Sequence, residues 1–287
     1  MNTHPSRIVC LSPETSETLC LLGEAQRIVG FSGSPARLPA EIHAKPRVSV
    51  QTTTCVDRIC ALEPDLVLGF GESHGDVLGG LAQRGVSVHL FNQRSVRGIL
   101  DMIRIVGSVV GRDAEAAHFA ATLEWRIEAI RARSVHERRP RIYFEEWDEP
   151  SITATSWVSE LITIAGGDNC FPELAHQRRP EGRVVHDSDE VVRRAPDIIV
   201  AAWNGKAFDR ESVLHRDGWA DVPAVWNGEI HAIPSSLILQ PGPAALTDGL
   251  DALHAIVEGW REHRTRMFQT AFASGDAAQE AGRERVA

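Results

Sequence analysis

The chain has 287 residues, of which 43% are hydrophobic and 24% are charged, and its formal net charge is −9 at pH 7. This composition is typical of a globular protein that buries a sizeable core, in one large domain or two ordinary ones. The negative charge argues against nucleic acid or an anionic membrane surface as a partner, because both favour clustered Lys and Arg. No apolar run reaches the length of a membrane span, so membrane insertion is not expected.

The N-terminus enters a strand-like run within a few residues. It has neither the basic segment nor the apolar stretch of a secretory signal, so the sequence as given predicts a cytoplasmic location. The alternative is an exported protein whose leader is absent from this sequence. The five cysteines are scattered and lack zinc-ligand spacing, which indicates reduced, buried thiols.

The segment "CVDRICALEPDLVLGF" at residues 55–70 predicts a helix, a turn and a buried strand in that order. Three of its first apolar residues fall on helical spacing, and the Pro64–Asp65 pair then leads into a run of branched apolar residues. Proline cannot extend the helix, and branched residues suit a strand that is covered on both faces.

Residues 112–137 predict one long helix in the middle of the chain. They contain no Gly or Pro, and four apolar residues share one helical face: Phe119, Leu123, Ile127 and Ile130. At about 1.5 Å per residue, such a helix is long enough to cross the back of two lobes. A helix is stiffer than a Gly/Ser linker, so we expect the lobes to rock little.

The Pro-Asp phrase then recurs as "RAPDIIVAAW" at residues 194–203, with Pro196 standing 132 residues after Pro64 (196 − 64). The helix before it begins near Asp187 or Ser188, either of which is a plausible N-cap. Three further pieces recur in the same order, at offsets of 134 or 143 residues: "RIVCLSP" with "RIYFEEW", "SETLCLLG" with "SELITIAG", and "RGVSVHLF" with "NGEIHAIP". Ordered recurrence predicts two similar α/β lobes.

The predicted organisation follows from this repeat. We expect an N-terminal α/β lobe over residues 1–111, a linking helix over 112–137, a C-terminal α/β lobe over 138–262 and a polar, disordered tail over 263–287. The fold class is α/β, with two Rossmann-like lobes of mostly parallel strands, one long connecting helix and a ligand cleft between the lobes. In open α/β sheets, ligands lie beyond the carboxyl ends of the strands.

Most of the candidate ligand-binding residues lie at or beside these predicted strand ends: Pro13, Glu14, Gln51, Phe70, Trp147, Trp203 and Gln240. Arg183 is a further candidate, which could serve an anionic ligand. Two of the candidates are tryptophans that end apolar runs, and their large flat rings suit a large, partly apolar ligand. The alternative is that both rings belong to the core or to packing between the lobes.

Catalytic and metal-binding patterns are weak. The chain has no G-x-S-x-G, P-loop or G-x-G-x-x-G motif, so we predict no catalytic residue. His74 and His186 could both reach the cleft and hold a metal. Twelve histidines scattered along the chain make chance placement the better interpretation, and neither a metal site nor a required cofactor is predicted.

The order of these motifs resembles the helical-backbone (class III) substrate-binding proteins of ABC importers, which capture vitamin B12, ferric siderophores and haem. The resemblance covers about residues 7–260 and rests on "RIVCLSPETSETLCLLG", "CVDRICALEPDLVLGF", the long middle helix, "SDEVVRRAPDIIVAAW" and "VWNGEIHAI". Within the family, "YFEEWDEP" followed by "WVSELITIAGG" looks most like cobalamin-binding proteins. The resemblance implies a monomer that delivers its ligand to a dimeric permease, and hence a periplasmic location.

Residue by residue, the resemblance implies that Pro13 lies at the cleft. It also implies that Asp57 and Asp189 are the paired acids that dock onto permease arginines, and these two are themselves 132 residues apart (189 − 57). The B12-binding relatives carry a tryptophan six residues before each docking acid, where this chain has Gln51 and Arg183. The glutamate-bearing turn near the last helix is replaced by "SSLILQPGP". The implied pocket therefore differs from the usual B12 pocket.

Three functional hypotheses remain open. The first is non-enzymatic binding of a corrinoid such as cobalamin. The second keeps the binding role but assigns a ferric siderophore, haem or a related chelate, with Arg183 and other arginines at the rim serving an anionic ligand. The third is a cytoplasmic enzyme on the same fold, since fold does not determine function.

Overall fold

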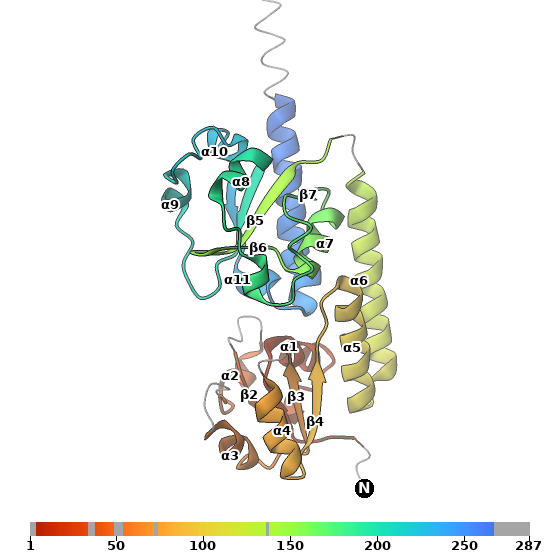
Figure 1. Ribbon diagram of the computed structural model, residues 1–287. Helices are drawn as coiled ribbons and strands as arrows, with labels where there is room; N and C mark the ends of the chain where they lie inside the picture. Colours follow the sequence, from red (N-terminus) through yellow and green to blue (C-terminus); the bar gives the residue numbers. More distant parts are fainter. Residues whose placement is uncertain (1–3, 34–37, 49–53, 72–73, 136–137, 267–287) are drawn as a thin grey trace, which may run out of the picture.

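The computed structural model describes residues 4–33, 38–48, 54–71, 74–135 and 138–266. The chain forms two α/β lobes stacked one above the other, and helix α6 (Asp113–Arg133) runs along one side of both (Figure 1). The fold class predicted from the sequence is therefore confirmed.

The N-terminal lobe is built around a four-stranded parallel sheet in the order β2-β1-β3-β4. Its strands are β1 (Ile8–Cys10), β2 (Ile28–Phe31), β3 (Leu66–Phe70) and β4 (Ser87–Phe91). Its helices are α1 (Pro13–Leu21), α2 (Ala40–His43), α3 (Thr54–Cys60), α4 (Gly75–Gln83) and α5 (Val96–Val110), with a 3-10 turn at Ala25–Arg27.

The C-terminal lobe repeats this sheet as β7-β5-β8-β9, again parallel, and adds β6 antiparallel to β5. Its strands are β5 (Arg141–Asp148), β6 (Ser151–Thr153), β7 (Asp168–Asn169), β8 (Ile198–Ala201) and β9 (Ile230–Ala232). Its helices are α7 (Ser156–Ile164), the 3-10 turn η3 (Pro180–Arg183), α8 (Ser188–Arg194), α9 (Arg210–Leu214), α10 (Pro223–Trp226) and α11 (Ser235–Ile238). A last helix, called here the C-terminal helix, covers residues 243–266 and contains a π-helical turn at Ala245–Gly249.

The repeated Pro-Asp phrase performs the same structural task in both lobes. Asp65 accepts a hydrogen bond from the backbone N–H of Arg7 at 3.0 Å, and Asp197 accepts one from that of Arg141 at 2.9 Å. Each aspartate thus ties the start of its own strand to the start of the neighbouring strand. The residue before each proline has a positive φ, 47° in the first copy and 44° in the second, so even the backbone strain is repeated.

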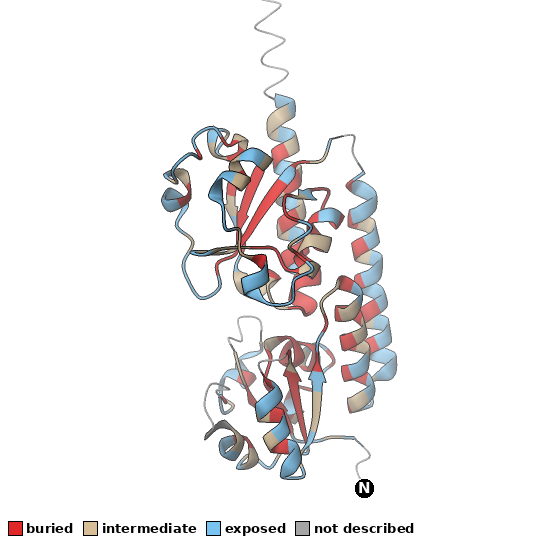
Figure 2. Cartoon of the chain, viewed as in Figure 1, coloured by how far each residue is buried: buried red, intermediate tan, exposed pale blue. Residues whose placement is uncertain are grey.

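Alternation along the strands divides their side chains between two faces. In β1, Ile8 and Cys10 face one cluster of buried residues, while Val9 faces another on the opposite side of the sheet. The first cluster does not stop at the lobe boundary, because it continues through α5, α6 and α7 to Phe144 in β5 and to the C-terminal helix. Figure 2 shows the buried strands of both lobes and the buried stripe of α6 that faces them.

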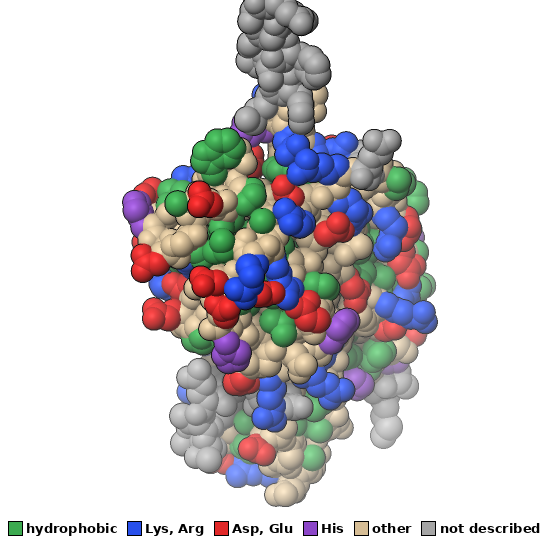
Figure 3. All heavy atoms as spheres, turned by 45° about the horizontal axis from the view of Figure 1, so that its top comes forward, with side chains coloured by type: hydrophobic (Ala, Val, Ile, Leu, Met, Phe, Trp, Pro, Cys, Tyr) green, Lys and Arg blue, Asp and Glu red, His purple; other side chains and the backbone are tan. Residues whose placement is uncertain are grey.

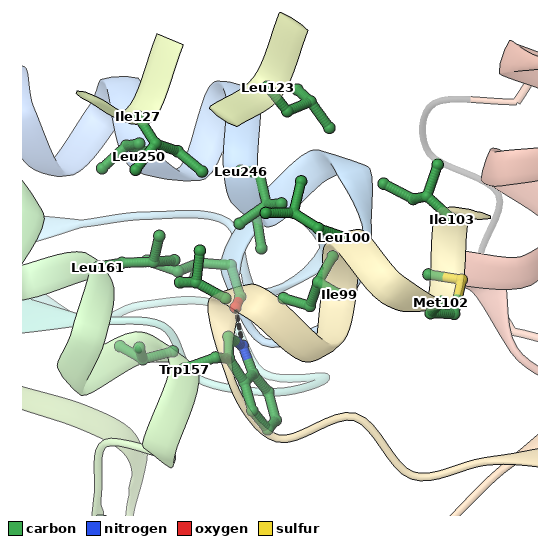
Figure 4. Close-up of a cluster of buried hydrophobic side chains, with 14 of the residues drawn as sticks. Ile99, Leu100, Met102, Ile103, Leu123, Ile127, Trp157, Leu161, Leu246 and Leu250 are labelled. Carbon is green, nitrogen blue, oxygen red and sulfur yellow. Dashed lines mark hydrogen bonds between the residues drawn. The ribbon is translucent and has the colours of Figure 1, made fainter. Parts of the chain in front are cut away.

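Figure 4 shows where this shared core crosses from one lobe to the other. Side chains from four helices meet there: Ile99, Leu100, Met102 and Ile103 of α5, Leu123 and Ile127 of α6, Trp157 and Leu161 of α7, and Leu246 and Leu250 of the C-terminal helix. The indole N–H of Trp157 donates to the carbonyl of Ile238 at 2.9 Å. The two lobes are therefore joined by packed side chains as well as by one helix.

Helix α6 lies within the predicted range of 112–137, and three of the four residues on its predicted apolar face are buried. It folds back against α5 after Gly111, whose φ of 73° provides the left-handed C-cap of α5. The two helices approach closely at Gly107, where a methyl group would overlap Ala116.

The C-terminal helix runs to residue 266, four residues into the range predicted as a polar tail, and residues 267–287 lie outside the described part of the chain. Among the described residues, no helix combines the length and the apolar character needed to cross a membrane. Acidic and basic side chains are interspersed on the face of the molecule that Figure 3 shows, and they do not gather there into one large basic patch.

Candidate ligand-binding site

The carboxyl ends of the two parallel sheets face each other across the boundary between the lobes (Figure 1). Loops that follow β1, β3 and β4 come from below this boundary, and those that follow β5, β8 and β9 come from above it. This is the edge at which open parallel sheets bind ligands. The candidate site is therefore the surface formed by residues that directly follow these strands.

Pro13 and Glu14 begin α1 directly after β1. Pro13 is half-buried against Gly33. Glu14 is only 2% exposed, and its Oε1 has no hydrogen-bond partner among the described residues. Burial, reinforced by the nearby charge of Glu17, raises the pKa of Glu14 to about 7. The N-terminal lobe thus holds a buried carboxyl group that keeps its proton to a higher pH than an exposed glutamate does.

Phe70 ends β3 and is half-buried against the shared core. Its backbone N–H donates to Nδ1 of His74 at 3.0 Å. His74 is 8% exposed, and burial lowers its pKa, so the ring is a neutral acceptor that holds the strand end. His186 is exposed at the other lobe. In the described ranges no three His, Cys, Asp or Glu side chains cluster in a way that could hold a metal ion.

Trp147 lies near the end of β5 and is half-buried. Its indole N–H donates to the carbonyl of Glu149 at 2.8 Å, and its side chain packs against the buried residues on the outer face of the second sheet. A partly exposed ring held at a strand end is suited to contact a flat apolar ligand.

Trp203 occupies a different position from the one predicted. It is 4% exposed and belongs to the core on the outer face of the second sheet, with its ring centroid 5.1 Å from that of Phe208. Its N–H donates to Glu145 Oε2 at 3.0 Å, and Arg216 donates two hydrogen bonds to the same carboxylate, at 2.7 and 3.0 Å. The expectation that Trp203 lines the cleft is therefore corrected, because a buried carboxylate satisfies its N–H inside the lobe.

Arg183 is likewise part of the interior. It is 3% exposed, forms an ion pair with Glu146 and donates to the carbonyl of Thr153 at 2.6 Å. These contacts neutralise its charge and fasten η3 to β5 and β6. The hypothesis that Arg183 serves an anionic chelate at the rim is corrected accordingly.

Gln240 is half-buried in the turn between α11 and the C-terminal helix, and its backbone carbonyl accepts from the N–H of Gly242 at 2.8 Å. The same turn packs tightly against the start of α1, since a methyl group on Gly242 would overlap Cβ of Glu14. Gln51 lies outside the described residues.

Two residues after β4 also belong to the lobe boundary and were not predicted. Gln93 donates from Nε2 to the carbonyl of Pro241 at 2.8 Å, and Arg94 donates to the carbonyl of Arg178 at 3.1 Å. Both hydrogen bonds join the N-terminal lobe to the C-terminal lobe. The sequence could have identified them from their position just after the predicted strand "GVSVHLF". The carboxyl end of β4 lies at the same edge of the sheet as the carboxyl ends of β1 and β3.

The two predicted docking acids differ in their surroundings. Asp57 lies in α3 with 70% of its side chain exposed, and it pairs with Arg84 at the end of α4. Asp189 is exposed in the first turn of α8, where its backbone N–H donates to the N-cap residue Asp187 at 3.0 Å. Asp187 is thus confirmed as one of the two predicted caps. Among the described residues, the Asp189 carboxylate has no ion-pair partner.

Comparison with known proteins identifies the family. A family model described as "Periplasmic binding protein" matches residues 8–237, well over half of the chain. A cobalamin-binding protein from Halobacterium salinarum is 26% identical over 254 residues, which cover 85% of this chain and 67% of that protein.

Two solved structures share the fold. The periplasmic vitamin B12-binding protein of Vibrio cholerae has a TM-score of 0.72 at 20% identity and covers 90% of this chain and 98% of its own. A periplasmic haem-binding protein from Roseiflexus sp. has a TM-score of 0.72 at 25% identity and covers 88% and 99%. The chain therefore belongs to the periplasmic binding protein family and is a two-lobed substrate-binding protein similar to the cobalamin-binding members.

Proposed function

We propose that this chain binds a corrinoid of the cobalamin type between its lobes, without catalysing a reaction, as the substrate-binding component of an ABC uptake system. The observation that carries the proposal is the arrangement of two parallel sheets whose carboxyl ends face each other over one shared core. Such an arrangement offers a large ligand two opposed surfaces. Relatives named cobalamin-binding and vitamin B12-binding match 85% and 84% of the chain.

The chemistry of the described strand ends favours a corrinoid over haem. Haem iron in binding proteins takes a His, Tyr, Met or Cys side chain as axial ligand. The chain has one tyrosine, Tyr143, which is fully buried and hydrogen-bonded to Glu145, and His74, the histidine beside the end of β3, is only 8% exposed. A corrinoid holds its cobalt in its own ring and needs hydrogen-bond partners and flat contacts instead. Glu14, Gln93 and Trp147 supply groups of that kind.

No resident cofactor is needed for this role, and the protein acts as a monomer. The transport half of the proposal places the protein outside the inner membrane, where it meets a permease dimer. Asp57 and Asp189 offer one exposed acid on each lobe to such a partner. Matched acids on two similar lobes suit a partner that has two-fold symmetry.

The decisive experiment is a parallel titration of the purified protein with cyanocobalamin, haemin and a set of ferric siderophores. Quenching of tryptophan fluorescence, with seven tryptophans in the chain, and the absorption spectrum of the complex report binding. We expect saturable one-to-one binding of cyanocobalamin and much weaker binding of the others. A Soret band or a ligand-to-metal charge-transfer band at saturation would transfer the assignment to haem or a siderophore, and turnover of any ligand would identify an enzyme.

A further inference from the structure

Two carboxylates reach across the boundary between the lobes, each to the start of a helix on the other side. Glu17 of α1 accepts a hydrogen bond from the backbone N–H of Ala244, at the start of the C-terminal helix, at 3.2 Å. Glu160 of α7 accepts one from the backbone N–H of Val96, the first residue of α5, at 2.9 Å. The first carboxylate leaves the N-terminal lobe and the second leaves the C-terminal lobe.

The internal repeat relates these two contacts to each other. α1 and α7 have nine residues each and start 143 residues apart (156 − 13), and the same offset separates Glu17 from Glu160 (160 − 17). The helices that receive them also correspond, since α5 follows β4 and the C-terminal helix follows β9, the last strand of each sheet. The same contact is therefore made twice, with the roles of the lobes exchanged.

Both hydrogen bonds are placed where a carboxylate is effective. The first N–H groups of a helix have no partner within the helix, and they favour a negative charge. In α5 the hydroxyl of the N-cap residue Ser95 accepts a hydrogen bond from the backbone N–H of Gly98 at 3.0 Å. The backbone N–H of Val96 is bound by Glu160 instead. Ala244 is 1% exposed and Glu17 is 7% exposed, so water cannot easily replace that pairing.

We propose that Glu17 and Glu160 are positioning residues of the binding site, which set the separation and tilt of the two strand-end surfaces. Hydrophobic packing in the shared core is strong but non-directional, so by itself it does not specify the angle at which α5 meets α7. A hydrogen bond weakens steeply as its length and angle change. Two such bonds, one from each lobe, therefore specify one relative orientation. This inference rests on the proposed function, because it concerns the same site.

The test compares three variants of the full-length chain. Glu17→Ala with Glu160→Ala removes both acceptors, whereas Glu17→Gln with Glu160→Gln keeps an amide oxygen at each position. Asp209→Ala is the matched control, because Asp209 caps α9 within one lobe by accepting from Glu211 at 3.0 Å. Spin labels attached through unnatural amino acids at Ala82 in α4 and Ser188 in α8, both exposed, report the distance between the lobes while the native cysteines stay in place.

We expect the double Ala variant to show a broadened and shifted distance distribution without ligand. The Gln variant and the Asp209→Ala control should match the parent. Cyanocobalamin affinity should fall about tenfold in the double Ala variant, because a less preorganised site binds more weakly. An unchanged distribution in the double Ala variant would overturn the proposal and leave both residues as ordinary caps.

If the double variant does not fold, the two single Ala variants carry the same comparison, each with one bond left. If the parent does not bind cyanocobalamin, the proposed ligand fails, but the distances still decide whether the two carboxylates hold the lobes.

Discussion

Trp203 and Glu145 form a buried hydrogen bond, 3.0 Å long, between the segment that directly follows β8 and the middle of β5. The same carboxylate accepts from Tyr143 at 3.1 Å, so an aromatic ring, a phenol and an arginine all converge on one acid inside the lobe. We expect Trp203→Ala to lower the free energy of unfolding by about 3–5 kcal/mol, because it leaves a large cavity. Chemical denaturation measures this loss. A ligand affinity that falls while the stability stays unchanged would instead place the ring in the site.

Trp147→Ala tests the other tryptophan, which is half-buried near the end of β5. We expect binding of cyanocobalamin to weaken by about 1–3 kcal/mol, since the ring would be a direct contact of the ligand. The melting temperature should change little. Isothermal titration and thermal melts of the two variants, Trp147→Ala and Trp203→Ala, separate a ligand contact from a core residue.

Glu14 predicts a specific pH dependence of stability. Its pKa is raised from 4.5 to about 7 in the folded protein, so the folded state holds the proton more tightly than the unfolded chain does. The stability that this group contributes is fully present below pH 4.5 and is lost as the pH rises through 7. The loss amounts to at most about 3 kcal/mol, at about 1.4 kcal/mol per pKa unit.

Glu14→Gln should abolish this loss of stability with rising pH, because glutamine does not titrate. We expect chemical denaturation to give a higher free energy of unfolding for Glu14→Gln than for the parent at pH 8. At pH 5 this difference between the two proteins should be smaller. Other carboxylates, such as Asp187 and Glu190, have pKa values that are lowered by arginines, so their contribution to stability changes with pH in the opposite direction. These carboxylates are the same in both proteins, so the difference between the two pH profiles reports Glu14 alone. Parallel pH profiles would contradict the prediction.

The paired variant Asp57→Asn with Asp189→Asn tests the docking hypothesis. We expect both the melting temperature and the affinity for ligand to stay near those of the parent, because both side chains are exposed. Association with a cognate permease should be lost, and in the parent this association should weaken with salt. Arg84→Gln is the companion variant, since it frees Asp57 and should strengthen association. A small loss of stability with unchanged association would identify two helix N-terminal acids instead.

Small-angle scattering with and without saturating cyanocobalamin should give nearly superimposable curves. The shared core and α6 both join the lobes, and neither can be rearranged by a ligand without separating packed side chains. A compaction of several ångströms on binding would show that the lobes close like a hinge.

The repeat could be predicted from the sequence because strand cores leave a strong local signal. Pro64 and Pro196 each stop a helix before branched apolar residues, and the aspartate after each proline bonds to a neighbouring strand. The fold follows from patterns of this kind, which lie within about ten residues of each other along the chain.

Most of the site could not be predicted in this way, because partners distant in sequence decide the role of each side chain. The charge of Arg183 is neutralised by Glu146, 37 residues away in the sequence. The indole N–H of Trp203 donates to Glu145, 58 residues away. Both side chains were interpreted from their place at the end of an element. Nothing in the local pattern shows whether a ring or a guanidinium there turns outward or folds back into the lobe.

The shared core also determines how the molecule comes apart. Residues of β1, near the beginning of the chain, and residues of the C-terminal helix, near its end, belong to one continuous cluster of buried side chains. Neither lobe can complete that cluster alone, so we expect the two lobes to unfold together in one cooperative transition. During synthesis, the part of this cluster that packs against the C-terminal helix stays uncovered until that helix leaves the ribosome, and we expect a chain shortened before residue 243 to leave that part exposed to chaperones and proteases.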